Sequence, residues 1–239
     1  MLNLKANSLR FFVALILATC VVRAAYADEK VSAYELLYDE QEIGTDVYAV
    51  RFTVTDRYIR IDDLSDDSGY ILYDDKENKI YSVSHFDESV FVIPAYKYKK
   101  PDMQDKVEEV YQPLTNAPKI SGKTVYNYRV NSVSDSKDVC VDIQLVPDLL
   151  PEVTKILQKY QKVVTGQQAK SLKSTPEEYQ TTCFIYNQVF NDGEYYAKGM
   201  PIQEWHSNGK KRILISYKKK DVNSEIFDHS EDYREYSLD

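Results

Sequence analysis

Residues 138–165, DVCVDIQLVPDLLPEVTKILQKYQKVVT, decide the fold because the hydrophobic period changes within them. Over residues 138–146 apolar side chains alternate with other residues, which is the period of a β-strand. From Leu149 onward they recur every three or four positions, which is the period of one helix face. Pro151 suits a first helical turn and Gly166 suits a helix end. We therefore expect a strand followed by a helix that ends near residue 165. The apolar stripe of this helix comprises Leu149, Val153, Ile156, Leu157, Tyr160 and Val164.

Upstream of this stretch, the chain has the pattern of consecutive antiparallel strands joined by polar turns. The alternation is clearest in residues 47–55, where one side of the strand carries Tyr48, Val50, Phe52 and Val54. Pro94 ends the run, because proline cannot donate to a strand ladder. We expect strands over residues 31–38, 47–55, 58–62, 69–73, 79–85, 89–93, 124–132 and 138–146, and a short one around residues 107–111.

A second helix is predicted downstream of the first. Residues 175–178, TPEE, match a capping box with proline at the first helical position. Residues 191–193, NDG, would end that helix. Together the two helices form a helical insert at about residues 148–191.

The last part of the chain predicts a closing hairpin. The Asn-Gly pair at residues 208–209 separates two apolar segments, residues 201–206 and 211–218, and both central residues of such a turn accept positive φ. The acidic tail, about residues 221–239, is either a last edge strand or a loose end. A long run of strands, then two helices, then a hairpin indicates a single α+β domain with an antiparallel sheet over residues 28–239.

The first 27 residues have the layout of a secretory signal peptide. A basic start is followed by an apolar run of about 12 residues, which is too short to span a bilayer as a helix, and then by small residues at the expected cleavage position before Asp28. Two alternatives remain, a lipoprotein signal with Cys20 as the lipidated residue and a retained anchor. Cleavage would give a periplasmic protein without a transmembrane segment.

Two cysteines remain after this cleavage, Cys140 and Cys183. An even pair in an oxidising compartment predicts a disulfide. The bridge would close a loop of about 43 residues, which the chain-entropy model associates with roughly 4 kcal/mol of stabilisation. It would join the second helix to a strand of the sheet.

The charge and composition of the chain exclude some partners. The net charge is −8, and removal of the signal peptide takes away three basic residues and no acidic one, which leaves −11. Such an acidic chain is poorly suited to nucleic acid or anionic lipid surfaces. The 21 tyrosines suit either a β-rich fold with a thin core or a tyrosine-lined cleft that stacks on a ligand.

The sequence predicts no catalytic site, no cofactor and no metal site. The three histidines, His85, His206 and His229, are far apart and do not have the spacing of metal ligands. Residues 62–69, DDLSDDSG, are the densest carboxylate cluster; they lack the order of a calcium-binding EF-hand loop and suit a solvated hairpin turn better.

Three strand segments resemble a known family. Residues 58–62 (YIRID), 69–74 (GYILYD) and 79–83 (KIYSV) are similar to the strand ladder of LolA-like periplasmic proteins and related exported domains. The resemblance covers about residues 30–95. It implies a curved antiparallel half-barrel with helices on its concave side, which in LolA and LolB takes up lipoprotein acyl chains. The helical insert with its cysteine pair departs from that pattern.

These observations predict an exported, non-enzymatic binding or chaperone-like protein of unspecified oligomeric state. Its ligand would be an apolar or lipid-like group, or a polypeptide segment, held between the curved sheet and the helices. An exported hydrolase with an unrecognised Asp/His site and a scaffold subunit of a periplasmic assembly are the alternatives. The expected ligand-binding residues, all on the concave face, are Tyr48, Val50, Phe52, Tyr81, Val83, Leu157 and Tyr186.

Overall fold

The computed structural model of the protein describes residues 29–100, 106–133 and 138–237. The expected signal peptide, residues 1–27, and with it Cys20, lie outside the described residues. The expected domain, residues 28–239, is described over nearly all of its length.

Twelve strands form one sheet in the order β12-β6-β5-β4-β3-β2-β1-β11-β10-β9-β8-β7. Neighbouring strands are antiparallel, except that β12 runs parallel to β6. The strands are β1 (Lys30–Gln41), β2 (Tyr48–Val54), β3 (Tyr58–Asp63), β4 (Gly69–Asp74), β5 (Lys79–Ser84), β6 (Ser89–Pro94), β7 (Val107–Pro113), β8 (Tyr126–Ser132), β9 (Val139–Val146), β10 (Met200–His206), β11 (Lys211–Asn223) and β12 (Arg234–Ser237).

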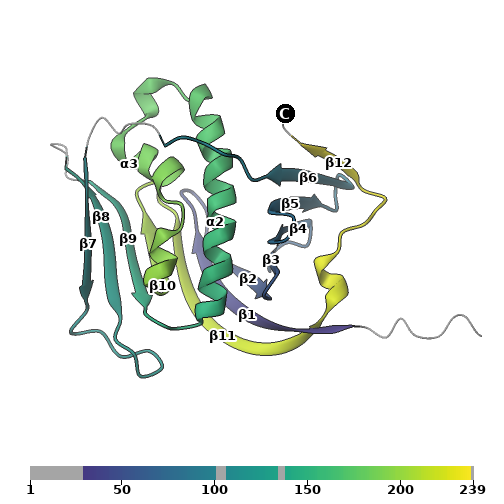
Figure 1. Ribbon diagram of the computed structural model, residues 1–239, viewed down its shortest axis with the longest axis horizontal. Coiled ribbons are helices and arrows are strands. Elements are labelled where there is room, and N and C mark those ends of the chain that lie inside the picture. Colours follow the sequence, from purple (N-terminus) through teal and green to yellow (C-terminus); the bar gives the residue numbers. More distant parts are fainter. Residues whose placement is uncertain (1–28, 101–105, 134–137, 238–239) are drawn as a thin grey trace, which may run out of the picture.

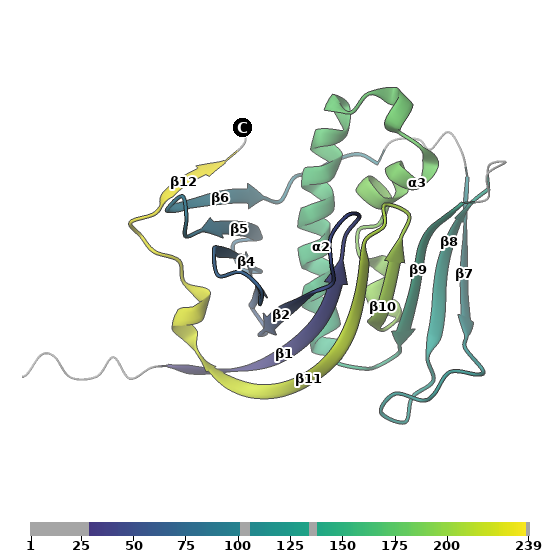
Figure 2. The ribbon, with the colours of Figure 1, turned by 180° about the vertical axis from the view of Figure 1, so that it is seen from behind.

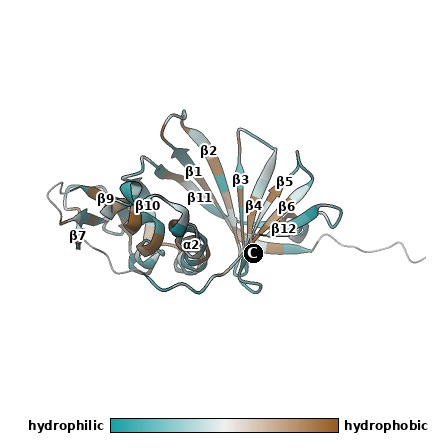
Figure 3. Cartoon of the chain, turned by 90° about the horizontal axis from the view of Figure 1, so that it is seen from above, coloured by the Kyte–Doolittle hydropathy of each residue, from teal (hydrophilic) through white to brown (hydrophobic). Residues whose placement is uncertain are grey.

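The sheet bends around one long helix, α2 (Pro151–Ser171). In Figures 1 and 2, β7 to β10 stand on one side of α2 and β2 to β6 on the other, while the long strands β1 and β11 curve beneath it. Seen from above in Figure 3, α2 lies on one face of the fan of strands. The predicted α+β class with an antiparallel sheet is therefore confirmed.

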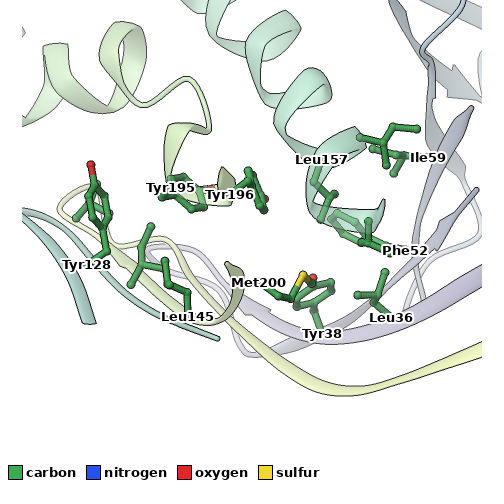
Figure 4. Close-up of a cluster of buried hydrophobic side chains, with 14 of the residues drawn as sticks. Leu36, Tyr38, Phe52, Ile59, Tyr128, Leu145, Leu157, Tyr195, Tyr196 and Met200 are labelled. Carbon is green, nitrogen blue, oxygen red and sulfur yellow. The ribbon is translucent and has the colours of Figure 1, made fainter. Parts of the chain in front are cut away.

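The main core fills the space between α2 and the concave face of the sheet (Figure 4). Phe52 on β2 and Leu157 on α2 are each 1 % exposed within the same cluster. Burying side chains of this size contributes roughly 1.5–3 kcal/mol each. The alternation predicted for β2 is confirmed, because Val50, Phe52 and Val54 all belong to this cluster and Tyr48 packs against it.

A second apolar cluster covers the opposite, convex face of β4 to β6. On β4, Tyr70 and Leu72 point into this cluster, while Tyr73 points into the main core. The tail covers this cluster through a 3₁₀ turn, η5 (Ser224–Phe227). The ring of Phe227 stacks on Tyr58 with centroids 5.1 Å apart. The tail then ends as β12, so the edge-strand interpretation of the tail holds.

Helix α2 is longer than predicted. It continues past Gly166 to Ser171, and Gly166 is buried inside it. A Cβ on Gly166 would lie 3.1 Å from the backbone oxygen of Tyr96. The absence of a side chain at Gly166 therefore allows α2 and a crossing segment to approach closely. The glycine does not mark the helix end that the sequence suggested.

The second helix begins later than predicted. Residues Glu177–Tyr179 form only a 3₁₀ turn, η2, and the helix α3 spans Thr182–Ile185. The side chain of Thr181 caps it by accepting a hydrogen bond from the Phe184 amide at 3.2 Å. The chain then continues as a π-helical turn, η3 (Tyr186–Phe190), and as a 3₁₀ turn, η4 (Glu194–Lys198).

The two candidate caps of this helix can be told apart by mutation. We expect Thr181→Ala to lower the free energy of unfolding by about 1 kcal/mol, because the Phe184 amide loses its partner. Thr175→Ala is the matched control, since the helix does not begin at the TPEE motif, and it should cost less than half as much. Urea unfolding of both variants measures the difference; an equal loss in the two would contradict this assignment of the cap.

The closing hairpin forms as predicted, with one difference in its turn. Gly209 has φ +80°, but Asn208 is not among the described residues with positive φ. The Gly209 amide donates to the His206 carbonyl at 2.9 Å, and the His206 amide donates to the Lys210 carbonyl at 3.0 Å. One left-handed residue therefore closes a turn for which the sequence suggested two.

Within the part of the chain that the structure describes, none of the helices combines the length and the apolar character that crossing a membrane requires.

Candidate functional site

The residues predicted to share one ligand cavity lie in two separate clusters. Five of them are in or against the main core: Tyr48, Val50, Phe52, Leu157 and Tyr186. Val83 belongs to the convex-face cluster, and Tyr81 packs against it. The seven residues pack into two clusters on opposite faces of the sheet, so they do not line one shared cavity. Alternation on β5 explains the error, because Ile80 is the residue of this strand that faces the main core.

The predicted disulfide joins Cys140 on β9 to Cys183 on α3, with their Cα atoms 4.6 Å apart. Both cysteines are buried. The bond attaches the start of α3 to the sheet, as the sequence predicted. It therefore positions the turn η3, which follows directly in the chain.

A groove of about 540 Å³ lies on the outer side of α2 and is the candidate functional site. Its first wall is residues 96–99, which belong to the segment between β6 and β7 that crosses the upper half of α2 in Figures 1 and 2. Its floor and second wall come from the last turns of α2, from Leu172 just beyond it and from Val189 on η3. The close packing of Tyr96 on Gly166 holds the crossing segment against the helix.

The crossing segment, residues 96–100 with the sequence YKYKK, presents two different faces to its surroundings. Tyr96 and Tyr98 are half-buried, whereas Lys97 and Lys99 are exposed. This alternation is what an extended segment with one packed face produces. The Tyr98 hydroxyl donates to the Val189 carbonyl at 3.4 Å. Burial, followed by the nearby carboxylate of Asp192, raises the pKa of Tyr98 to about 12, so this side chain is a neutral phenol at physiological pH.

Among the described residues that line the groove, the charged side chains are lysines. Lys97 and Lys99 come from the crossing segment, and Lys170 and Lys173 come from the end of α2 and the turn after it. The Lys170 ammonium lies 4.4 Å from the centre of the Tyr96 ring. Among the described residues, no carboxylate lines this groove, although the chain as a whole has a net charge of −8. The groove therefore combines an apolar floor with a cationic rim.

A second cavity, of about 550 Å³, lies on the other side of the crossing segment, and its lining places two carboxylates among three lysines. Lys100 pairs with Asp192 at 3.0 Å, and Lys159 pairs with Asp75 at 2.5 Å. A carboxylate beside a lysine repels an anionic ligand and weakens the attraction of the ammonium group. For this reason we place the candidate site in the first groove.

The carboxylates of the acidic loop, residues 62–69, accept hydrogen bonds from serines of the same loop and pair with two arginines. Asp62 pairs with Arg51 at 3.2 Å and with Arg60 at 2.9 Å. The Ser68 hydroxyl and amide donate to Asp66, which lowers the pKa of its carboxyl. No group of three or more metal-ligating side chains occurs in residues 29–100, 106–133 and 138–237. The solvated-turn interpretation of this loop agrees with these contacts.

The three histidines remain apart in the fold. His85 contacts the Tyr233 hydroxyl at 3.0 Å, and His229 lies 3.6 Å from Glu235. His206 lies 3.5 Å from the buried carboxylate of Glu204. His206 and Glu204 line a small cavity together with other polar side chains. His85 lines a separate surface pocket of about 530 Å³ together with Arg51, Arg60 and carboxylates of the acidic loop.

Comparisons with known proteins identify no family for this chain. No family model matches it, and no curated protein does. An uncharacterised conserved protein from Thermus thermophilus is similar over 86 % of this chain and 90 % of its own, with 8 % identity and a TM-score of 0.41. PNGF-II, in its C2 crystal form, is similar over 87 % of this chain, with 10 % identity and a TM-score of 0.40. This chain spans 31 % of that PNGF-II chain. Likenesses this weak establish neither family nor function.

The sequence analysis missed the groove although one signal for it is visible. The Tyr-Lys alternation of residues 96–100 marks an extended segment with one cationic face. Nothing in the sequence indicates, however, that this segment crosses α2 about 70 residues further along the chain.

Proposed function

We propose that this protein is an exported, non-enzymatic binding protein that holds a single-chain amphipathic anion, such as a long-chain carboxylate. The groove with an apolar floor and a rim of lysines is the observation that carries this proposal. Its volume lies within the usual range for small-molecule sites, roughly 300–1,000 Å³. The apolar chain would pack on Tyr98, Ala169 and Leu172, and the anionic head would lie among the lysines.

Export to the periplasm is part of the same proposal. The disulfide supports it, because such bonds persist in oxidising compartments. The LolA-like resemblance is consistent with a lipid-like ligand, and the curved antiparallel sheet around a helix supports it. The ligand position proposed here differs from the family pattern, because none of the described strands of the sheet lines the groove.

The surroundings of His206 do not favour a hydrolase site at this residue. A histidine that acts as a general base needs a ring nitrogen free to accept a proton. Both ring nitrogens of His206 face acceptors of the protein, the Glu204 carboxylate at 3.5 Å and the Asn187 amide oxygen at 3.3 Å. No nitrogen of this ring is left for a substrate.

Titration of the mature protein with dodecanoate tests the proposal, and dodecyltrimethylammonium is the matched ligand with the same chain and the opposite charge. We expect dodecanoate to bind and the cation to bind far more weakly. Lys97→Glu/Lys173→Glu should weaken dodecanoate binding by about tenfold or more, because two attractions near the head group become repulsions. Calorimetry or displacement of a fluorescent fatty acid measures the affinities.

Two further variants test separately whether ligand binding depends on the charge and on the shape of the groove. Lys155→Glu makes the same kind of change on an exposed lysine near the start of α2, and it should leave dodecanoate binding unchanged. Ala169→Trp fills the groove without altering any charge, and it should abolish binding. Equal binding of the two surfactants, or an equal loss of affinity in Lys155→Glu, would refute the proposed site.

A further inference from the structure

A small polar cavity of about 150 Å³ lies beside the β10–β11 hairpin. Side chains from α2, η3, η4, β10 and β11 line it. At about 30 Å³ for each molecule of liquid water, its volume corresponds to about five waters. That is less than a drug-sized ligand needs, so the cavity suits one small ring or group.

The charged groups of this cavity neutralise one another. Glu204 is 5 % exposed and lies 3.5 Å from His206 and 3.7 Å from Arg212. Behind it, the equally buried Glu40 accepts a hydrogen bond from Arg212 at 2.7 Å and lies 3.5 Å from Lys210. Two carboxylates therefore face two permanent cations, and neither kind of charge is left over for a charged ligand.

Asn187 fixes the orientation of His206. Its amide nitrogen donates to the Cys140 carbonyl at 3.3 Å and to the Ser207 hydroxyl at 2.9 Å. Its amide oxygen must then face the histidine ring, at 3.3 Å. The disulfide at Cys183, four residues earlier in the chain, anchors the same segment. The wall of the cavity is thus held in place before any ligand arrives.

The remaining lining is neutral and rich in hydrogen-bonding groups. Six carboxamide side chains line the cavity, and a carboxamide group carries both donors and an acceptor. The π-helical turn η3 and the residue after it bring three of them together, and such turns occur often at functional sites. The Oε1 atom of Gln168 is buried and has no hydrogen-bond partner among the described residues. These six side chains are Gln161, Gln168, Asn187, Gln188, Asn191 and Asn208.

Two tyrosines complete the cavity. The rings of Tyr160 and Tyr195 form part of its lining. The Tyr195 hydroxyl donates to Glu204 at 3.4 Å, and burial, followed by the charge of Glu204, raises the pKa of this phenol, so it stays neutral. Aromatic faces beside carboxamides suit a ring with apolar C–H faces and hydroxyl groups around its edge.

We propose that this cavity is a second binding site, for a neutral polyhydroxylated ring of the size of one monosaccharide unit. Hydroxyl groups both donate and accept, which matches carboxamides that do the same. A charged ligand would be disfavoured, because it would add an uncompensated charge to a network that is already balanced. This site is separate from the lysine-rimmed groove and does not depend on the ligand proposed there.

Saturation-transfer NMR and calorimetry with a panel of free sugars test this site. The panel pairs neutral hexoses and N-acetylglucosamine with their charged counterparts, glucuronate and glucosamine. We expect at least one neutral sugar to bind in the millimolar range and the charged counterparts to bind more weakly. Gln168→Ala and Gln188→Ala should each weaken the binding by about tenfold through lost hydrogen bonds.

Gln167→Ala is the matched control, because the neighbouring glutamine does not line the cavity although its Oε1 atom is also buried without a partner among the described residues. We expect its sugar affinity to equal that of the parent protein. Thermal unfolding of the three variants verifies that each is folded. The proposal is overturned if no neutral sugar binds, if glucuronate or glucosamine binds as tightly, or if Gln167→Ala loses affinity to the same extent.

Discussion

We expect that replacing both Cys140 and Cys183 by alanine lowers the free energy of unfolding by about 4 kcal/mol. This is the value that the chain-entropy model gives for a loop of 43 residues. The unfolded chain regains the freedom that the bond removes. In the folded protein, the start of α3 also loses its attachment to β9. For a chain of this length, the loss corresponds to roughly 8–16 °C in melting temperature.

Thermal unfolding with and without dithiothreitol measures this effect. The reductant should lower the melting temperature of the parent protein by a similar amount and leave the double alanine variant unchanged. A loss below about 1 kcal/mol would mean that packing of α3 holds the segment without the bond.

Replacing Arg212 by methionine should destabilise the protein by about 3–5 kcal/mol, because it removes the buried cation that two buried carboxylates share. Arg212 bonds to Glu40 and lies beside Glu204, and both carboxylates are 5 % exposed. The guanidinium also lies 5.0 Å from the centre of the Phe52 ring, a cation–π contact that methionine cannot make.

The loss of stability in Arg212→Met should be smaller at low pH than at neutral pH. Burial opposes ionisation of Glu204, but His206 and Arg212 outweigh burial and lower its pKa below the usual value of 4.5. In the parent protein, this group therefore stabilises the fold above about pH 4.5, and the contribution is lost as the pH falls through the lowered pKa. In Arg212→Met this carboxyl can take up a proton more readily, so the difference between the two proteins should shrink near pH 4.

Urea unfolding at pH 7 and pH 4 tests this expectation. Lys211→Met is the control on the same strand. Its exposed side chain donates a long hydrogen bond of 3.5 Å to Gln41, and its replacement should change stability by less than about 0.5 kcal/mol. The triple variant Arg212→Met/Glu40→Gln/Glu204→Gln should recover part of the loss, since it removes the unpaired charges. Equal losses at the two pH values would contradict the proposed network.

The sequence predicted local features well where one period was maintained. The strands from β1 to β9 and the apolar stripe of α2 were found because side chains alternate or recur within a few residues. The helix starting at Thr182 was misplaced, because a capping motif at residues 175–178 satisfies the local pattern without the helix beginning there. Gly166 was misjudged because its role depends on Tyr96, far away in the chain.

The candidate sites were less accessible to sequence analysis. The lysine-rimmed groove joins residues near 97 to residues near 170, and the polar cavity joins β10 and β11 to η3. The residues expected to bind the ligand were chosen for their apolar character, and that character instead placed them in packed clusters.

The sequence by itself determined the antiparallel α+β class, the cysteine pair and the acidic net charge, since these follow from local period and composition. Only the tertiary structure decided which face of β5 meets the main core, where the segment of residues 95–100 crosses α2, and which charges are paired. The physical reason is that strand order and chain crossings depend on the free energy of packing the whole molecule, in which contacts between distant residues outweigh local preference.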